Sequence, residues 1–418
     1  MIEYDVCVIG AGPAGLSAAL QLKDCSVCMI EREEKPGGIL KQCIHDGFGL
    51  IKFNAEMTGP EYSQRYIDEL MTTDIKVYMK TFVSNINYIC EKNIQIELIN
   101  PEQGMFQIKV KSIIFATGCR ERTAKQVFIH GERPAGILTA GSAQYFVNVS
   151  GYLPCRKCVI LGSGDIGLIM ARRLTLEGAE VLGVYEIKDS SSGLQRNIAQ
   201  CLEDFNIPLH LSETVIKTHG DDRLTGVTVA KVDSEFNVIK GTEKYLECDG
   251  LILSVGLIPE NELTKEMGIQ IDSHTKGPIV DQNMMTSLKG VFACGNQVHV
   301  NDLVDYVSKS GEIAAKACME YIKGNDYEKE DIRIKFDDSE FLYIVPQVIN
   351  RQNENMNVTF FFRSSRKLRD AYVKIEINDK EIVNKSYIAL NPPELQVIDI
   401  ALGTLSQHDN IKFKINQR

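Results

Sequence analysis

One local pattern, which occurs twice in this chain of 418 residues, constrains the fold more than any other feature of the sequence. In its first copy, an apolar run at residues 4–9 leads into Gly10-Ala11-Gly12-Pro13-Ala14-Gly15. A small and apolar stretch follows, and a second apolar run ends at Glu31. This order predicts a strand, a tight glycine turn, a helix and a second strand parallel to the first.

The second copy lies in the middle of the chain. The apolar run 158–161 leads into Gly162-Ser163-Gly164-Asp165-Ile166-Gly167, and the apolar run that follows the next helix ends at Glu186. Because each copy is a βαβ unit, the sequence predicts an α/β fold with two Rossmann-like domains, each a sheet covered by helices in three layers.

The spacing inside both copies is typical of dinucleotide binding. The first glycine makes the tight turn, the second lets the backbone approach a pyrophosphate, and the third lets the helix pack closely on the strand. The acidic residue about 20 positions later accepts hydrogen bonds from ribose hydroxyls. One such match is a weak signal, but two complete copies indicate that the chain binds two dinucleotides.

Three further apolar runs fit the same frame. They are 113–118, ending in Thr117-Gly118; 249–261, which contains Gly256; and 290–296, ending in Gly295-Asn296. Together with the two fingerprints, they resemble the flavoproteins with two dinucleotide-binding domains, the superfamily of thioredoxin reductase and glutathione reductase. The resemblance covers residues 1 to about 325, and it implies that the first fingerprint holds FAD and the second a nicotinamide dinucleotide.

The resemblance also implies individual contacts. Those expected for FAD are Gly10, Gly12, Pro13, Ala14, Gly15, Glu31, Arg32, Gly38, Ile39, Thr117, Gly118, Gly295 and Asn296, and those expected for NAD are Gly162, Gly164, Asp165, Ile166, Gly167, Glu186 and Gly256. One departure is that Asn296 stands where the superfamily has Asp, although an amide can still hydrogen-bond a ribityl or phosphate oxygen.

Domain boundaries follow from the same resemblance, in which the NAD domain is inserted into the FAD domain. We expect an FAD domain at 1–122 and 275–328 and an NAD(P) domain at 123–274. From about residue 329 short apolar runs alternate with turns, which predicts a small antiparallel β domain through residue 418. Its aromatic run Phe360-Phe361-Phe362 is explained equally well by a packed core and by a docking site for another subunit.

NAD is the expected nicotinamide cofactor rather than NADP. A 2′-phosphate would lie against the Glu186 carboxylate, a like-charge contact. Lys188 and Arg196 are close enough in sequence to offset that repulsion, so NADP stays open as an alternative.

Cys43 is the candidate catalytic residue, and two interpretations of it remain open. Disulfide reductases of the superfamily place a cysteine pair just after the double glycine or within the NAD domain, but Cys43 has no second cysteine close behind it. It is either a single reactive thiol, with His45 lowering its pKa, or a small residue that fills space below the flavin. His299 is, like His45, either a proton donor or a structural imidazole.

Other charged and sulfur-containing motifs have a structural and a functional interpretation. Cys25/Cys28 and Cys155/Cys158 have Cys-x-x-Cys spacing, but they precede glycine turns instead of capping helices, which argues against redox activity. Arg120-Glu121-Arg122 and Arg133 either line a cofactor cleft or belong to a solvated linker. Neither the cysteines nor the histidines have metal-ligand spacing, so no metal is expected.

Composition excludes several classes of function. With 46 basic and 56 acidic residues the net charge is −10, which disfavours nucleic acid. We find neither an apolar stretch long enough to span a membrane nor a signal peptide, and twelve cysteines in this length do not make a disulfide scaffold, so we expect a cytoplasmic protein with thiols.

Three hypotheses of function follow. The segments 37–49, 133–136 and 302–307 resemble the FAD- and NAD-binding subunits of dehydrogenases for opines, for cyanide-forming glycine oxidation and of glycerol-3-phosphate gene clusters. The first hypothesis is therefore an FAD-dependent NAD(H) oxidoreductase that exchanges electrons with partner dehydrogenase or iron-sulfur subunits. The second is a self-contained flavin reductase that uses Cys43 on a disulfide, peroxide or oxygen. The third is an FAD-bound, non-catalytic scaffold.

Overall fold

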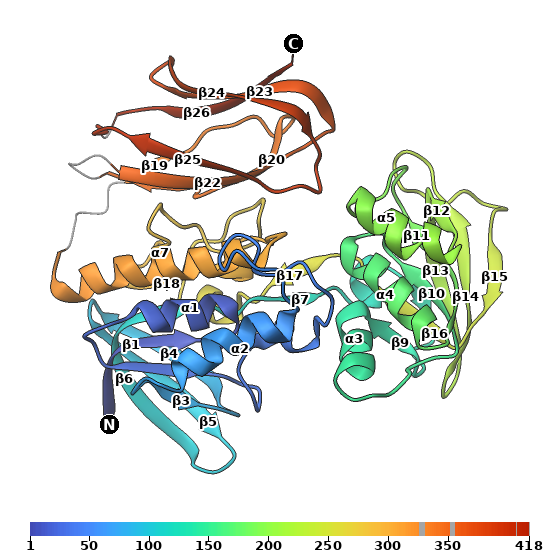
Figure 1. Ribbon diagram of the computed structural model, residues 1–418, viewed down its shortest axis with the longest axis horizontal. Helices are drawn as coiled ribbons and strands as arrows, with labels where there is room; N and C mark the ends of the chain where they lie inside the picture. Colours follow the sequence, from blue (N-terminus) through green and yellow to red (C-terminus); the bar gives the residue numbers. More distant parts are fainter. Residues whose placement is uncertain (326–330, 352–355, 407, 418) are drawn as a thin grey trace. The chain divides into compact units, whose positions relative to one another are not determined.

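The computed structural model describes residues 1–325, 331–351, 356–406 and 408–417 (Figure 1). The chain divides into two compact units. Unit 1 comprises Met1–Cys119 and Pro259–Arg418, and unit 2 comprises Arg120–Ile258. The expected domain boundaries near 122 and 274 stay predictions, and the one near 328 lies outside the described residues.

Unit 1 contains a seven-stranded sheet in the order β3-β2-β1-β6-β5-β4, and β18 also pairs with β6. The strands around β1 are parallel, because β1 pairs in parallel with β2 and β6, β2 with β3, and β6 with β18. β4 and β5 form an antiparallel extension. The bounds are β1 (Ile2–Ile9), β2 (Val27–Ile30), β3 (Lys76–Tyr78), β4 (Phe82–Cys90), β5 (Asn93–Asn100), β6 (Gly104–Phe115) and β18 (Val291–Ala293).

The helices of unit 1 begin and end at residues suited to these positions. α2 begins with a capping box between Thr58 and Glu61, and α7 ends at Gly324 in the left-handed conformation. α1 and α7 lie side by side in Figure 1, and Ser17 Oγ of α1 donates a hydrogen bond to Ser308 O of α7. The helical segments are α1 (Pro13–Gln21), η1 (Gly38–Gln42), α2 (Gly59–Leu70), α6 (Glu262–Glu266), η4 (Gly295–Gln297) and α7 (Val304–Lys323).

Unit 2 has a parallel sheet in the order β12-β11-β10-β16-β9 and a second sheet in the order β15-β14-β13-β8. Residues 119–121 and 257–259, where the chain passes between the units, form the paired strands β7 (Cys119–Glu121) and β17 (Leu257–Pro259). The remaining elements are η2 (Ala124–Val127), β8 (His130–Gly131), β9 (Ile137–Thr139), α3 (Ala140–Asn148), β10 (Lys157–Leu161), α4 (Asp165–Leu176), β11 (Glu180–Glu186), α5 (Gln195–Cys201), η3 (Glu203–Phe205), β12 (Leu209–Leu211), β13 (Glu213–Gly220), β14 (Leu224–Lys231), β15 (Lys244–Glu247) and β16 (Gly250–Leu253).

The C-terminal part of unit 1 is a β domain, as the sequence predicts. Its two three-stranded antiparallel sheets have the orders β20-β22-β25 and β24-β23-β26, and β19 pairs with β21. The bounds are β19 (Asp331–Arg333), β20 (Phe341–Val345), β21 (Val348–Asn350), β22 (Met356–Ser364), β23 (Leu368–Ile377), β24 (Lys380–Leu390), β25 (Gln396–Leu402) and β26 (Ile411–Gln417).

Three consecutive phenylalanines of β22 are fully buried, which identifies the aromatic run as core. Because successive side chains of a strand point to opposite faces, Phe360 and Phe362 pack in the core of the β domain. Phe361 packs instead in the core that contains β1, β6 and α7. Both faces of β22 are therefore covered, and we expect no docking site at this run.

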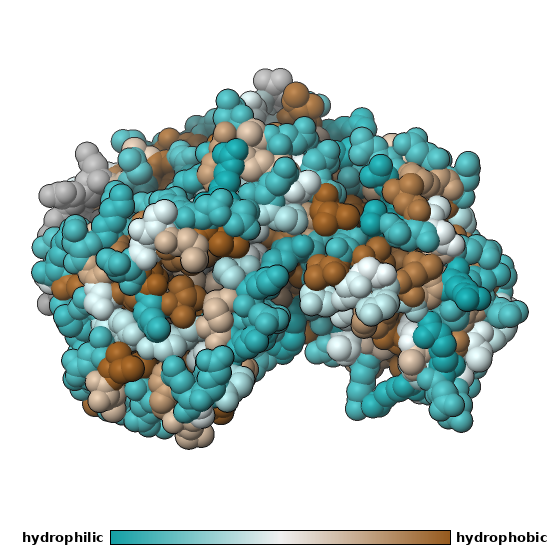
Figure 2. All heavy atoms as spheres, turned by 60° about the horizontal axis from the view of Figure 1, so that its bottom comes forward, coloured by the Kyte–Doolittle hydropathy of each residue, from teal (hydrophilic) through white to brown (hydrophobic). Residues whose placement is uncertain are grey.

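The observed sheets confirm the predicted fold class, an α/β chain with two Rossmann-like parts and a C-terminal antiparallel β domain. No helix among the described residues is long and apolar enough to span a membrane. The face drawn in Figure 2 is mostly hydrophilic, with hydrophobic residues scattered over it.

Candidate functional site

The first glycine turn brings the end of β1 against the start of α1. Gly10 has a φ of +105°, and a Cβ at this position would collide with the carbonyl of Ala116. A Cβ on Gly15 would collide with the carbonyl of Gly10. The turn therefore requires glycine at both positions, and Gly12 and Pro13 begin α1.

The N-terminus of α1 is a suitable site for an anion. The N-cap is Gly12, no side chain caps the helix, and no acidic residue lies in its first turn. Unpaired N–H groups and the helix dipole together attract phosphate at such an end. Gly38 lies against this turn, because a Cβ on Gly38 would come within 2.9 Å of the Gly12 Cα atom.

Glu31, at the end of β2, is held in place by backbone donors. It is 6% exposed, its Oε2 accepts a hydrogen bond of 2.8 Å from Ala11 N, and its Oε1 accepts one of 2.8 Å from Glu33 N. Each carboxylate oxygen retains a second acceptor position, which suits a ribose hydroxyl. Arg32 and Ile39 are more exposed, and Arg32 lies 3.9 Å from the Glu260 carboxylate.

Thr117 and Gly118 meet a residue that the sequence did not single out. Thr117 Oγ1 donates to Glu260 O at 3.0 Å, Glu260 N donates to Gly118 O, and Gln297 Nε2 donates to the same Glu260 carbonyl at 3.3 Å. Glu260 thus joins three segments far apart in the sequence. The sequence around Glu260 did not predict these contacts, because Glu260 makes them through its backbone N and O atoms.

Gly295 and Asn296 lie beside α1. A Cβ on Gly295 would lie 2.8 Å from the Ala14 Cβ, and Gly295 N donates to Ser310 Oγ at 2.8 Å. Asn296 Oδ1 accepts from Asn301 N at 3.0 Å. The Asn296 oxygen is thus engaged within the loop, so its amide nitrogen is the group suited to a ligand oxygen.

The segment that follows Gly295 concentrates buried acceptors without a protein partner. They are Gln297 Oε1, His299 Nδ1, Asn301 Oδ1 and Asp305 Oδ2. A ligand rich in O–H and N–H donors would satisfy such atoms, as the ribityl chain and pyrimidine ring of FAD do. The residues present therefore fit FAD, and Gln297, Asn301 and Asp305 are candidates that the fingerprint could not reveal.

Cys43 does not have the environment of a reactive thiol. It follows η1 and is not on a strand, and burial alone raises its pKa to about 12. His45 Nδ1 contacts Asp46 O at 2.9 Å and is not among the groups that shift the Cys43 pKa. The hypothesis that His45 lowers this pKa is therefore wrong.

The second glycine turn repeats the geometry of the first. Gly162 has a φ of +101°, and a Cβ there would collide with Ser254 O. A Cβ on Gly167 would collide with Gly162 O, and Gly164 is the N-cap of α4, without a side-chain cap. This end also offers N–H groups to an anion, but unlike α1 it has an acidic residue, Asp165, in its first turn.

Glu186 is the counterpart of Glu31, with more partners. It is 5% exposed, and its Oε2 accepts from Ser163 N at 3.0 Å, from Ser163 Oγ at 2.6 Å and from Ser192 Oγ at 3.3 Å. Its Oε1 accepts from Lys188 N at 3.2 Å. The carboxylate is thus fixed next to the glycine turn.

The remaining predicted residues of unit 2 differ in their surroundings. Asp165 Oδ1 accepts from Leu194 N at 2.8 Å and from Asn197 Nδ2 at 2.6 Å, so its carboxylate caps the 194–197 segment. Ile166 is partly exposed, and Gly256 O accepts from Arg122 N at 3.0 Å.

The charged segment after Thr117-Gly118 is largely solvated. Arg120, Arg122 and Arg133 are exposed. Glu121 instead accepts from Gly141 N through both carboxylate oxygens, at 2.9 Å, and so caps α3. His299 is fully buried, and this burial lowers its pKa to about 3, so it is a neutral imidazole at physiological pH.

No cysteine of the chain is in a disulfide, and all twelve are described. In unit 2 every cysteine is buried: Cys155, Cys158, Cys201 and Cys248. The hydrogen bond between the Cys155 and Cys158 thiols lowers the pKa of Cys155 and raises that of Cys158. Neither Cys-x-x-Cys pair caps a helix, since Cys28 lies on β2 and Cys158 on β10.

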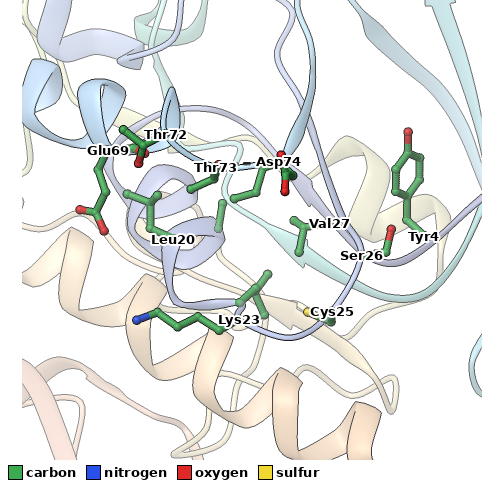
Figure 3. A pocket seen from close by; sticks show the side chains of 13 residues that line it. Tyr4, Leu20, Lys23, Cys25, Ser26, Val27, Glu69, Thr72, Thr73 and Asp74 are labelled. Atoms are coloured by element: carbon green, nitrogen blue, oxygen red, sulfur yellow. Dashed lines mark hydrogen bonds between the residues drawn. The ribbon is translucent and has the colours of Figure 1, made fainter.

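One pocket of unit 1 lies away from these residues. It has a volume of about 430 Å³ and lies where α1 and α2 end and β2 begins, between Lys23, Glu69 and Asp74 (Figure 3). The described residues that line it include none of the predicted site residues. Among the described residues, no group of His, Cys, Asp and Glu side chains is arranged to hold a metal ion.

Comparison with known proteins agrees with this geometry. Residues 4–319 match the family described as pyridine nucleotide-disulphide oxidoreductase. Hydrogen cyanide synthase subunit HcnB of Pseudomonas protegens is 25% identical over 63% of the chain, and the chain spans 58% of that relative. Thioredoxin reductase of Listeria monocytogenes is 28% identical over 77% of the chain and 94% of the relative.

The solved structure of T. acidophilum thioredoxin reductase has the same fold, with a TM-score of 0.61, 22% identity, and coverage of 77% of this chain and 99% of that one. The family match, which spans more than half of the chain, decides the assignment. The chain belongs to the pyridine nucleotide-disulphide oxidoreductase family and is an FAD-dependent pyridine nucleotide oxidoreductase.

Proposed function

We propose that this chain transfers hydride between NAD(H) and FAD as one subunit of a dehydrogenase or electron-transfer complex. The observation that supports this proposal most strongly is that its cysteine thiols are poorly suited to redox chemistry. Burial raises the pKa of Cys43 to about 12, and every cysteine of unit 2 is buried. A thiol that stays protonated is a poor nucleophile, and a buried thiol such as Cys155, whose pKa is lowered, is out of reach of a substrate disulfide. Electrons on the flavin would then leave to an acceptor outside the chain.

FAD would be bound by residues of unit 1. The pyrophosphate would lie at the N-terminus of α1, and the Glu31 carboxylate would bind a ribose. The acceptors Gln297 Oε1, Asn301 Oδ1 and Asp305 Oδ2 would bind hydroxyl or N–H donors of the cofactor. Bound FAD supplies the hydride chemistry, and these residues supply binding and orientation.

For the nicotinamide cofactor, the proposal assigns the N-terminus of α4 to the pyrophosphate and Glu186 to the ribose. Glu186 also supports NAD over NADP. Its carboxylate is fixed by Ser163 and by Lys188 N, so it cannot easily turn away from a 2′-phosphate. The Lys188 and Arg196 side chains are exposed.

The partner is proposed by analogy with HcnB, which is by name a subunit of hydrogen cyanide synthase. The composition of this chain adds a constraint. Its last cysteine is Cys318, so the C-terminal β domain contains no thiolate ligand for an iron-sulfur cluster.

The experiment that tests this proposal compares wild type with Cys43→Ser in dye-linked NADH oxidation by the purified chain. We expect the two rates to agree within about twofold, because Cys43 takes no part in hydride transfer. Cys90→Ser, at an exposed position, is the matched control. Dye-linked oxidation stays near normal under either function, so the deciding measurement is NADH oxidation with a disulfide or a peroxide as the acceptor. Rapid turnover by wild type that Cys43→Ser alone loses by more than about tenfold would contradict the proposal.

The second candidate is a flavin reductase that uses Cys43 on a disulfide, peroxide or oxygen. The likeness to a thioredoxin reductase over 94% of its length favours it. It requires Cys43→Ser to abolish turnover of the physiological acceptor while dye reduction persists. The family is one of oxidoreductases, which argues against a non-catalytic scaffold.

A further inference from the structure

Arg363 of the C-terminal β domain binds the loop that follows Gly295-Asn296. It lies on β22, and its side chain is only 12% exposed. Its Nη2 donates to Val300 O at 3.3 Å and to the Asp302 carboxylate, with which it forms an ion pair. The two remaining contacts stay within the β domain, from Nε to Tyr343 Oη at 2.8 Å and from Nη1 to Pro393 O.

Other groups of the β domain hold the same loop. Leu395 N donates to Asp302 Oδ2 at 2.6 Å, so both carboxylate oxygens of Asp302 bind to this domain. The His299 ring lies between Tyr343 and Phe361, at centroid distances of 5.7 and 5.1 Å. Residues 299–302 are therefore fixed by the C-terminal β domain as well as by their own segment.

The loop that Arg363 holds also carries the unpartnered acceptors. Asn301, between the two residues that Arg363 contacts, donates through its backbone N to Asn296 Oδ1 and keeps its own Oδ1 without a protein partner. His299 Nδ1 and Asp305 Oδ2 flank it. A displacement of Val300 and Asp302 would therefore move Asn301 and Asn296 together.

We propose that Arg363 is a positioning residue for FAD: by holding Val300 and Asp302 it sets the position of Asn296 and Asn301 toward the cofactor. The C-terminal β domain is then part of the flavin site without contributing a catalytic residue. This inference rests on the proposed FAD site in unit 1.

The docking of the β domain does not depend on Arg363 alone, so the two roles can be separated. Gln282 Nε2 donates to Asn350 O at 2.8 Å, and Asn350 N donates back to Gln282 Oε1 at 2.8 Å. Val280 N donates to Gln347 Oε1 at 3.0 Å. Phe361 adds an apolar contact to the core of unit 1.

The test uses the full chain with Arg363→Met, which keeps the length of the side chain and removes its charge and donors. Arg363→Lys restores the charge without the fork of donors. The matched control is Lys309→Met, which removes an exposed ion pair of 3.1 Å with Asp399 that links α7 to the same β domain. For each, FAD affinity is measured by reconstitution of the apoprotein, with the visible flavin spectrum and urea unfolding alongside.

We expect Arg363→Met to weaken FAD binding at least about tenfold, because the Asp302 carboxylate, whose side chain is 31% exposed, loses its charged partner and the loop shifts. The flavin spectrum should change, Arg363→Lys should recover part of the affinity, and Lys309→Met should stay within about twofold of wild type. If Arg363→Met does not fold, Asp302→Asn is judged by the same comparison, with an expected loss of at least about threefold.

Two results would overturn the inference. One is an unchanged FAD affinity and spectrum in folded Arg363→Met. The other is an equal loss in Lys309→Met, which would mean that domain docking alone matters. A wild-type chain that binds no FAD would overturn the proposed function itself. This result is distinguishable from failure of the Arg363 inference, because it is seen in the wild type before any variant is compared.

Discussion

Ser163 Oγ donates a hydrogen bond of 2.6 Å to Glu186 Oε2, and Ser163 N donates a second to the same oxygen. In unit 1 the corresponding pair is Ala11 N and Glu31 Oε2, at 2.8 Å. In both glycine turns, the residue between the first two glycines thus fixes the acidic residue at the end of the next strand. The two βαβ units share this hydrogen bond, so each acidic side chain is held next to its glycine turn.

Replacement of Glu186 by Gln should raise the KM for NADH about tenfold and reduce the preference for NADH over NADPH by at least the same factor, because a ribose acceptor and a like-charge barrier are both lost. The measurement is kcat/KM for the two nucleotides. Glu180→Gln is the control, since Glu180 begins the same strand β11 but is exposed and pairs only with Lys157. An unchanged NADH-to-NADPH ratio in Glu186→Gln would contradict the assignment.

Replacement of Gly295 by Ala should destabilise the protein by about 1–3 kcal/mol more than Gly104→Ala does. Both glycines have nearly the same positive φ, +69° and +70°, so the backbone strain is matched. Only at Gly295 does a Cβ meet a neighbour, Ala14 Cβ at 2.8 Å. Urea unfolding measures the difference in unfolding free energy. Equal losses in Gly295→Ala and Gly104→Ala would mean that α1 accommodates the added methyl group at Gly295 without loss of stability.

Cys43 should react slowly with iodoacetamide. Because burial raises its pKa to about 12, its thiolate fraction at pH 8 is about a thousandfold below that of an ordinary thiol. Its rate should still rise about tenfold per pH unit up to pH 10. Mass spectrometry of alkylated peptides measures the rate, with exposed Cys90 as the internal reference. Alkylation of Cys43 as fast as that of Cys90 would identify it as a reactive thiol.

His299 should make the fold sensitive to acid. Burial, and next the charge of Arg363, lower its pKa to about 3, below the ordinary value of about 6.5. Between these two values the unfolded chain binds a proton that the folded chain does not, so stability falls as pH falls through this window. Arg363 is the charged group that acts on His299.

Between pH 7 and pH 5, the wild type should therefore lose about 2 kcal/mol of unfolding free energy through His299. His299→Gln should lose correspondingly less over the same interval, whereas His130→Gln, at an exposed position, should follow the wild type. Urea unfolding at the two pH values measures this, and parallel losses in wild type and His299→Gln would refute it.

Much of the fold was predictable because its signals are local. The glycine turns, Glu31 and Glu186 are spaced along the sequence by the geometry of a βαβ unit. The β domain was predicted from its short apolar runs between turns. Strand β24 gives a weaker signal of this kind, because its side chains are largely exposed. The burial of both faces of β22 was missed because it depends on contact with the rest of unit 1.

The parts of the site that escaped prediction are made by residues distant in sequence. Glu260 acts through backbone atoms, and Arg363 reaches Asp302 across 61 positions, so neither has a local motif. The environment of Cys43 also depends on the fold, because the sequence placed it near His45 but did not show that it would lie half-buried just beyond the end of η1, with a raised pKa.

The most direct test of hydride transfer by this chain is anaerobic titration of the purified holoprotein with NADH, followed by flavin absorbance. We expect full bleaching at about one equivalent, because one bound FAD accepts two electrons and the proposed function involves no redox-active disulfide. NADPH should bleach the flavin only at much higher concentration. A requirement for about two equivalents would reveal a redox-active disulfide in addition to the flavin, and a flavin that stays oxidised with both nucleotides would contradict hydride transfer by this chain.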